Sequence, residues 1–558
     1  MQRNKHLLLW TSLGTLLLLG WAAYAENQLQ EWRVLQRRYR EALPADRRTE
    51  FTIQLRQIVV PQLDAADRCV SCHVGMAPGE PGVIGTAAFA PHPTIAHDPS
   101  QFGCTICHGG QGRATTKADA HGSVRHWPEP MIPARLSYAG CGTCHSHLAV
   151  PSLPQVERGR ALFERNDCLA CHRMEGRGGT LRPGGTGGME GPDLSRAGVA
   201  GFDRAWHAGH ERQHAAAAAG PWHDSFAAVP ADDRTAIDGF LTSRAGAPGL
   251  VEAKGLFHSL GCRGCHPIGG VGGDDGPDLT REGERDPGQL DFSRVPGERT
   301  LGAWLGEHFR SPAAVVPGSA MPALGLTEPQ IEQLTFYLLS LRRRELPGEF
   351  WPKDRVLAER FGEREFAADG GTLFGTFCAA CHGPAGEGMR YAGVPAFPAI
   401  GNADFLAIAS DDFLRANITH GRPGRRMPSW GEKEGGLRPT EIDTLVSYVR
   451  ALGGGTAPPP ESRPARWVAP GAGCGSALYA DNCALCHGAG GEGKEGPALA
   501  NRVLLAAATD TYLVETIRRG RGGTSMPPYG EAGTTHRLLA DEEIEAIVAF
   551  MRTWEKRS

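Results

Sequence analysis

The chain has 558 residues, of which 41% are apolar and 22% charged, and its formal net charge is −4. At about 150 residues per domain, this length predicts three or four domains. The composition excludes a polytopic membrane protein, a collagen-like fibre and a basic nucleic-acid-binding protein. Only 7% of the residues are aromatic, which is few for side chains that usually fill cores. The 15 cysteines fit either a disulfide scaffold or a metal-binding protein, so their spacing has to decide.

The N-terminal segment is predicted to cross a membrane. A short basic end precedes the uncharged apolar run Leu7–Ala25, which is long enough to span a bilayer as a helix. The basic end should stay in the cytoplasm, which places the rest of the chain outside it. Ala23-Tyr24-Ala25 also fits a cleavage site, so a removed signal peptide is the rival interpretation. We expect an uncleaved anchor over residues 1–25 and, because Glu26–Leu43 lacks helix breakers, a helical stalk over 26–60.

A C-x-x-C-H pattern contains 14 of the 15 cysteines. Chance predicts about 0.015 such strings in a chain of this composition, whereas seven are present. Two thiols one helical turn apart can each form a thioether with a haem vinyl group, and the following histidine can bind the iron. Disulfides, zinc sites and thioredoxin-like pairs leave the recurring histidine unexplained. We therefore predict seven covalently bound haem c groups and one spare thiol, Cys474. The seven motifs are Cys69-Cys72-His73, Cys104-Cys107-His108, Cys141-Cys144-His145, Cys168-Cys171-His172, Cys262-Cys265-His266, Cys378-Cys381-His382 and Cys483-Cys486-His487.

The motif spacing predicts the domain organisation. First cysteines at positions 69, 104, 141, 168, 262, 378 and 483 leave gaps of 35, 37 and 27 residues, then of 94, 116 and 105. The short gaps cannot each hold a haem-wrapping domain, so we expect a loop-rich three-haem module over 61–150. The long gaps suit one small helical domain per haem. We place these domains at 155–245, 250–345, 365–452 and 471–558, with a proline-rich linker over 453–470.

The four one-haem segments resemble class I cytochromes c. Each ends in an amphipathic helical pattern, over residues 232–241, 328–341, 441–452 and 541–554. Gly159-Arg160-Ala161-Leu162-Phe163 precedes the first of these motifs, Gly191-Pro192-Asp193-Leu194 follows it, and Gly276-Pro277-Asp278-Leu279 repeats the latter. The resemblance covers about residues 155–558 and implies an all-α fold. A haem in each core would explain the scarcity of aromatic residues.

The same resemblance implies a distal methionine before the last helix, often followed by proline. Met321, Met427 and Met526 fit this description, and thioether ligation raises the haem potential. The domain around Cys168 has no such methionine. An ungapped alignment of residues 205–223 with 303–321 places His223 on Met321, so we predict a bis-histidine haem there, with His207 or His214 as the fallback.

The three-haem module lacks a Met-Pro pair but contains five histidines outside its motifs. From His92, His97, His121, His126 and His147 we expect three distal ligands and favour His97, His121 and His126, with Met131 as an outside alternative. The stretches 102–115, 120–122 and 126–130 resemble the N-terminal module of membrane-anchored multihaem cytochromes that accompany bacterial quinol-oxidising complexes. This resemblance covers about residues 30–150 and implies a route from membrane quinol to periplasmic haems.

Two further motifs match known binding patterns but lack the sequence context that those patterns need, so we reject both. His210-Glu211-Arg212-Gln213-His214 fits the H-E-x-x-H zinc pattern, but it aligns with an ordinary helix of the next domain. The glycine pattern over residues 488–493 fits a dinucleotide fingerprint, but it follows a haem histidine where that fingerprint needs a strand.

The resemblances together imply an electron-transfer protein of the bacterial cytoplasmic membrane, with its haem domains in the periplasm. It would accept electrons from membrane quinol-oxidising subunits of the cytochrome b/iron-sulfur type. It would pass them to a soluble periplasmic carrier or to a terminal oxidase or reductase. The predicted ligands suggest a potential that rises from the N- to the C-terminus. The rivals are a catalytic multihaem enzyme, such as a peroxidase or small-oxyanion reductase, and an extracellular electron conduit.

Overall fold

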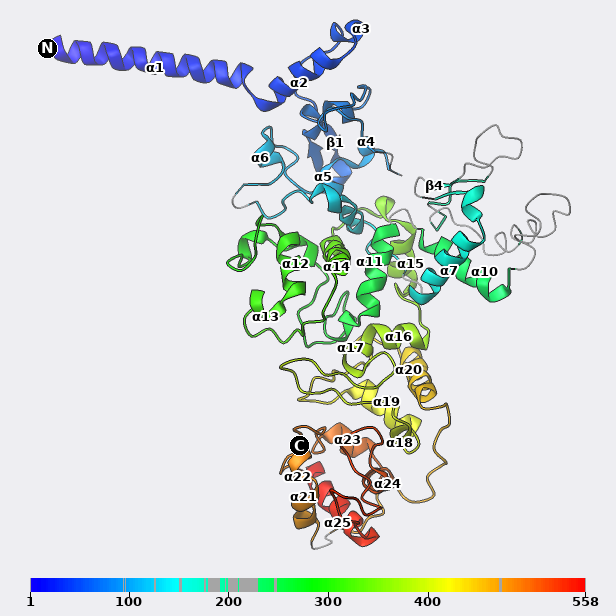
Figure 1. Ribbon diagram of the computed structural model, residues 1–558. Coiled ribbons are helices and arrows are strands. Elements are labelled where there is room, and N and C mark those ends of the chain that lie inside the picture. The colour runs from blue at the N-terminus through cyan, green and yellow to red at the C-terminus, as the bar shows by residue number, and fades with distance from the viewer. Residues whose placement is uncertain are drawn as a thin grey trace. The chain divides into compact units, whose positions relative to one another are not determined.

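The computed structural model describes residues 2–93, 95, 97–124, 127–149, 153–174, 177–178, 191–195, 197–198, 209, 229–244, 248–470 and 474–556. Helices and loops form nearly all of this part of the chain, as predicted (Figure 1). Its strands make two small antiparallel hairpins, β1 (Ile58–Val60) with β2 (Ala65–Asp67) and β3 (Arg173–Met174) with β4 (Arg177–Gly178). The chain divides into two compact units.

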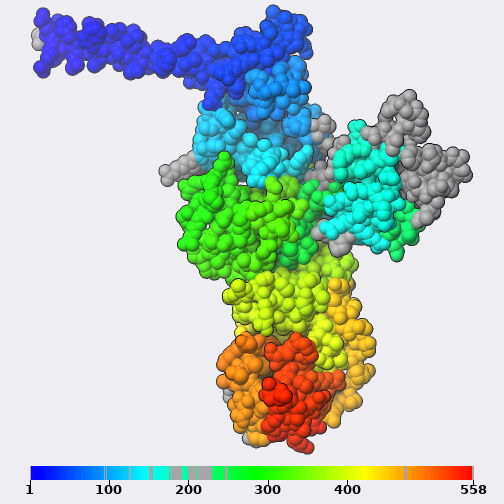
Figure 2. Space-filling model, in the orientation of Figure 1, coloured from blue at the N-terminus to red at the C-terminus, as the bar shows by residue number. Residues whose placement is uncertain are grey.

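The N-terminal helix α1 spans Gln2–Gln28 and is long and apolar enough to cross a membrane. Figure 2 shows it as an exposed rod, and none of its residues is buried. The helix ends before Glu31, where α2 (Glu31–Ala42) begins.

The predicted helical stalk over 26–60 needs correction, because α2 is part of the first unit's core. Its Trp32, Gln36 and Tyr39 are buried, and the Tyr39 hydroxyl donates to the carbonyl of Pro81 at 2.6 Å. Leu43 is extended, as residues before proline usually are, so α2 cannot continue through Pro44. Beyond it lie the short α3 (Ala45–Arg48) and strand β1.

The first unit contains residues 1–146 together with 283–304 and 339–356. Its elements are short, as expected for a loop-rich module. They are η1 (Pro61–Leu63), η2 (Cys69–Ser71), η3 (Val74–Met76), α4 (Pro99–Phe102), α5 (Thr105–His108), α6 (Lys117–Ala120), η4 (Ala134–Thr143), η8 (Pro287–Gln289) and η9 (Gly348–Phe350). The two later segments contribute apolar side chains to this unit: Leu346 is buried with Ile58 and Ile106, and Phe350 lies 5.7 Å from Phe102 between ring centroids. The predicted module boundary at residue 150 therefore leaves out residues 283–304 and 339–356, which belong to the same compact unit.

The second unit contains residues 147–282, 305–338 and 357–558. In this unit, the first helix of each predicted domain packs against the last helix of the same domain. The pairs are α7 (Leu153–Arg165) with α10 (Ala231–Ser243), α11 (Pro248–Ser259) with α14 (Glu328–Ser340), α16 (Gly370–Phe377) with α20 (Pro439–Leu452), and α21 (Gly475–Asn482) with α25 (Asp541–Arg552). The other elements of this unit are η5 (Cys168–Ala170), η6 (Cys262–Gly264), α13 (Pro312–Val315), α17 (Ala379–His382), α18 (Ala403–Leu406), α19 (Asp411–His420), α22 (Ala484–His487), α23 (Arg502–Ala507), α24 (Asp510–Arg519) and η10 (Thr553–Lys556). Three further elements, like α14, contain residues of both units: η7 (Glu282–Glu284), α12 (Leu301–Arg310) and α15 (Lys353–Phe361).

A glycine lets the first helix approach the last. A Cβ on Gly159 would lie 2.0 Å from the carbonyl oxygen of Ala236, and one on Gly475 would lie 2.0 Å from that of Ala546. An aromatic residue four positions later completes each crossing, as in the pair Tyr479 and Phe550, whose ring centroids are 5.6 Å apart. This packing explains the Gly-x-x-Leu-aromatic pattern before the motifs.

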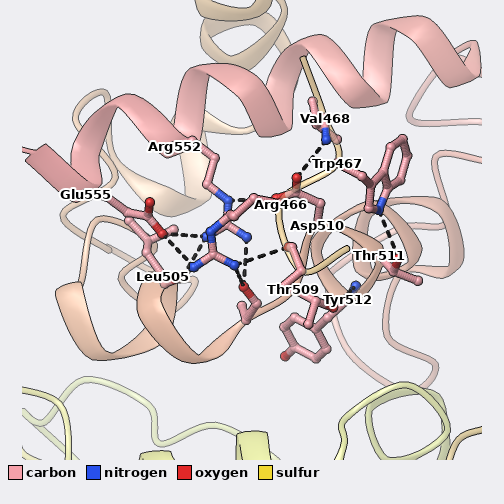
Figure 3. A network of polar contacts seen from close by, with 12 residues as sticks. Arg466, Trp467, Val468, Leu505, Thr509, Asp510, Thr511, Tyr512, Arg552 and Glu555 are labelled. Atoms are coloured by element: carbon pink, nitrogen blue, oxygen red, sulfur yellow. Dashed lines mark hydrogen bonds and ion pairs between the residues drawn. The ribbon is translucent and has the colours of Figure 1, made fainter. Parts of the chain in front are cut away.

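The last two domains share a repeated arginine network. Arg552 of α25 pairs with the buried Asp510 at 2.8 Å and donates to the carbonyls of Leu505 and Ala508 (Figure 3). Arg450 of α20 makes the equivalent contacts in the preceding domain, with Asp411 and the carbonyls of Leu406 and Ala409. In Figure 3 the end of the proline-rich linker joins this network, because Val468 N–H donates to Asp510 at 2.8 Å.

The same two domains contact each other through equivalent residues. Asn402 donates to the carbonyl of Gly522 at 2.6 Å, and its counterpart Asn501 donates to that of Pro423 at 3.2 Å. The rings of Phe413 and Tyr512, which occupy matching positions in α19 and α24, lie 4.3 Å apart. The contact is therefore reciprocal, as in a symmetric dimer.

Replacing Gly475 by leucine should separate α21 from α25. We expect Gly475→Leu to lower the free energy of unfolding by about 2–3 kcal/mol, the usual cost of overpacking. Thermal unfolding followed by circular dichroism measures it. Gly375→Ala in α16 is the matched control, because no atom lies within 4 Å of its added Cβ. Equal melting temperatures for Gly475→Leu and the unmodified protein would contradict the close-contact explanation.

Candidate haem sites

All seven C-x-x-C-H motifs form one helical turn. In each, the histidine N–H donates to the carbonyl of the first cysteine at 2.8–3.0 Å. The motif residues therefore stand on successive positions of a turn, which suits two thioethers and one iron ligand on a single porphyrin. No two of the 15 cysteines form a disulfide, and the described residues contain no cluster of three or more side chains that could hold a bare metal ion.

In each of the four predicted one-haem domains, a proline carbonyl orients the motif histidine. Nδ1 lies 2.8–2.9 Å from that oxygen in all four domains, which requires Nδ1 to carry the proton and leaves the Nε2 lone pair for a metal. The pairs are His172 with Pro192, His266 with Pro277, His382 with Pro398 and His487 with Pro497. Burial lowers the pKa of His266, His382 and His487, which favours the neutral ring that a metal needs.

A glycine before the proline makes room for the histidine ring in three of these domains. A Cβ on Gly276 would lie 2.4 Å from Cε1 of His266, and Gly191 and Gly496 occupy the same place beside His172 and His487. The 365–452 domain has Phe397 at this position. The residues present thus fit a haem whose proximal ligand is fixed from behind by a loop.

In the predicted three-haem module, the motif histidines have different neighbours. Each motif ring has a second histidine ring beside it, with centroids 6.3 Å apart for His73 and His121, 6.1 Å for His108 and His92, and 6.2 Å for His145 and His97. Of the predicted distal ligands, His97 and His121 are therefore brought to motif histidines. His126 and His223 lie outside the described residues, as do His207 and His214, so those predictions stay predictions.

A carboxylate lies behind one of these rings. Nδ1 of His145 is 3.3 Å from Oδ1 of Asp354, with the two side chains 20% and 19% exposed. Carboxylate, histidine and metal in this order form a familiar arrangement that makes the histidine a stronger donor. Asp354 lies 209 residues from His145, so the sequence gives no signal for the pair. The proline carbonyls, in contrast, lie in the Gly-Pro repeats, which are a usable signal.

The motifs also contact one another within each unit. In the first unit the thiols of Cys69 and Cys104 are within hydrogen-bonding reach, a contact that lowers the pKa of Cys69 and raises that of Cys104. Gly140, next to Cys141, packs so tightly on Cys107 that a Cβ would lie 1.6 Å from its carbonyl oxygen.

The second unit has one such contact among its described residues. The Cys265 and Cys381 side chains interact, which lowers the pKa of Cys265 and raises that of Cys381. Nearby, a Cβ on Gly261 would lie 2.7 Å from the backbone nitrogen of Ala380. The motifs of the 250–345 and 365–452 domains are therefore directly apposed.

The three predicted distal methionines lie in loops before the last helix of their domains. Met321 precedes α14, Met427 precedes α20 and Met526 precedes α25, and all three are half-buried. The last two loops have the same backbone bond, from Arg422 N–H to Met427 and from Arg521 N–H to Met526, at 2.8 and 3.0 Å. The glycine pattern at 488–493 follows α22 directly, with no strand before it.

The helix pairs, the helical C-x-x-C-H turns and the oriented histidines define a multihaem c-type cytochrome with an N-terminal helix of membrane-spanning length. Residues 250–342 match the family model described as cytochrome c. Residues 365–449 and 472–551 match the model described as cytochrome c oxidase, cbb3-type, subunit III.

Known proteins similar to this chain are subunits of that oxidase. The Cbb3-type cytochrome c oxidase subunit FixP of a Bradyrhizobium species is 33% identical over 171 residues, which cover 29% of this chain and 54% of FixP. Subunit CcoP of Rhodobacter capsulatus is 32% identical over 197 residues, or 33% of this chain and 61% of CcoP. The chain thus spans about half of the length of the curated relatives it matches.

Replacing Gly276 by alanine should displace the His266 ring and break its bond to Pro277. We expect Gly276→Ala to destabilise this domain by about 2 kcal/mol, from overpacking and a lost hydrogen bond. Thermal unfolding followed at the haem absorption band measures this effect. Gly306→Ala in α12 is the control, since its nearest neighbour would be 3.8 Å from the new Cβ. An unchanged midpoint in Gly276→Ala would contradict the role of this glycine.

Replacing Asp354 by asparagine should raise the potential of the haem that His145 is predicted to bind. Loss of the anion behind the ring weakens the donor and costs the oxidised iron about 1 kcal/mol, or roughly 40 mV for one electron. Potentiometric titration with optical detection measures the shift. Asp46→Asn on the exposed α3 serves as the charge-matched control, and an equal shift in both variants would argue against the proposed pair.

Proposed function

We propose that this protein carries seven covalently bound haem c groups and serves as a membrane-tethered electron-transfer subunit of a respiratory or photosynthetic complex. In this proposal Leu7–Ala25 is an uncleaved anchor in the cytoplasmic membrane and the haem domains lie in the periplasm. The three-haem module receives electrons, and the one-haem domains pass them on.

The observation that supports this proposal best is the contact between motifs. Each cysteine of a motif forms a thioether to the porphyrin edge, so touching motifs place porphyrin edges near one another. Among the described residues, three motifs are in contact in the first unit and two in the second. An isolated catalytic haem has no use for such contacts, whereas a chain of electron carriers depends on them.

The distal ligands that we propose give the chain a direction. They are Met321, Met427 and Met526, with His223 in the 155–245 domain and histidines that include His97 and His121 in the three-haem module. Methionine ligation raises the haem potential relative to bis-histidine ligation, so potentials would rise toward the C-terminus. Electrons would then flow from the three-haem module to the last domains.

The similarities of the C-terminal domains and of residues 30–150 to other proteins suggest the partners of this protein. The C-terminal domains are similar to oxidase subunits, so a terminal oxidase or a soluble carrier that serves one would accept the electrons. The resemblance of residues 30–150 favours membrane quinol-oxidising subunits of the cytochrome b/iron-sulfur type as the donor.

Exchange of a distal methionine tests both the ligand and the direction. We expect Met526→His to lower the potential of the last haem by roughly 100–300 mV, within the span that axial ligands cover. Potentiometric titration of the detergent-solubilised protein gives this value, and Met389→His, in a loop methionine without a following proline, serves as control. A titration curve of Met526→His that matches that of the unmodified protein would contradict the assignment.

Haem content tests the proposal as a whole. We expect seven haems per chain by the pyridine haemochrome assay, and negligible carbon monoxide binding to the reduced protein because every iron has two protein ligands. A lower haem count would overturn the proposed number. Stoichiometric carbon monoxide binding would favour a catalytic haem instead.

A further inference from the structure

The three-haem module contains a histidine pair at each motif, and the pairs share no member. His73 lies beside His121, His108 beside His92 and His145 beside His97, with centroid separations of 6.1–6.3 Å. Two imidazoles that bind one metal from opposite sides, each through a bond of about 2 Å, have ring centroids about 6 Å apart. The recurrence of this separation with a different partner at every motif is what bis-histidine ligation requires.

A hydrogen bond fixes the protonation of the His92 ring in the form that can bind a metal. Its Nδ1 lies 2.7 Å from the carbonyl oxygen of Pro93, so Nδ1 donates and the Nε2 lone pair is available. The motif histidines of the four one-haem domains show the same arrangement, with a proline carbonyl behind the ring. The ring is also half-buried, which suits a ligand that would be covered by a haem.

We propose that His92 is the distal ligand of the haem attached to Cys104 and Cys107, while His121 and His97 serve the haems of His73 and His145. The inference rests on the proposed multihaem function and deepens it. It replaces His126, which the sequence favoured as the third ligand, and it assigns each distal histidine to one haem.

The ring planes give each site a distinguishable signature. The planes of His73 and His121 are 20° apart and those of His145 and His97 are 29° apart, so both pairs are close to parallel. The planes of His108 and His92 are 64° apart. Nearly parallel axial rings give low-spin ferric haem a rhombic electron paramagnetic resonance spectrum. Nearly perpendicular rings give a single feature at a much larger maximal g value.

The test uses the oxidised full-length protein purified in mild detergent, with the haem count measured on the same sample. We expect one large-g signal in the unmodified protein. His92→Ala should lose it, gain a high-spin signal and bind one equivalent of carbon monoxide when reduced. The haem count should stay at seven, because the thioethers remain. His92→Met should restore a low-spin haem at a higher potential, which separates ligation from misfolding.

His126→Ala is the comparison variant, and it should keep the large-g signal. Retention of this signal in His92→Ala, or its loss in His126→Ala, would overturn the assignment and leave the multihaem function standing. A count below seven in the unmodified protein would instead count against the proposed function.

Discussion

The hydrogen bond from each of the last four motif histidines to a proline carbonyl is the constraint on which the predicted one-haem domains depend. A histidine binds a metal only through a nitrogen that lacks a proton, and the proline carbonyl determines which nitrogen that is. The loop that delivers the carbonyl must approach the ring closely, so in three of four domains glycine precedes the proline. His266, Gly276 and Pro277 therefore act as one structural element, although ten residues or more separate the ring from the loop.

The arrangement of helices in each domain suits a core that is built around a large planar group, the proposed haem. The proposed haem would supply the apolar volume that aromatic side chains supply elsewhere, so each domain needs only one helix crossing to close it. Gly475 and Tyr479 at that crossing let α21 and α25 approach without a thick layer of side chains. The Arg552 and Asp510 network then ties α25 to the helices on the other side, and Arg450 and Asp411 repeat it.

The predicted three-haem module holds its motifs with fewer residues for each motif. Its motifs touch, its helices are short, and residues 283–304 and 339–356 return to complete its core. Asp354 illustrates the consequence, because a side chain far along the sequence orients the ring of His145. Such support from distant segments is expected where about 35 residues per motif leave too little local structure to hold each ring.

The sequence by itself determined the haem-binding turns, the all-α class, the apolar N-terminal helix and the methionine loops. These depend on short-range spacing: a cysteine pair and a histidine on one helical turn, or a proline after a methionine. Only the tertiary structure decided that α2 belongs to the module and that His92 lies beside His108. It also decided that Cys265 meets Cys381. These contacts join residues that are not neighbours in the chain, and burial and backbone approach between separate segments select them. A single sequence records the spacing of its motifs but not which distant segments pack together.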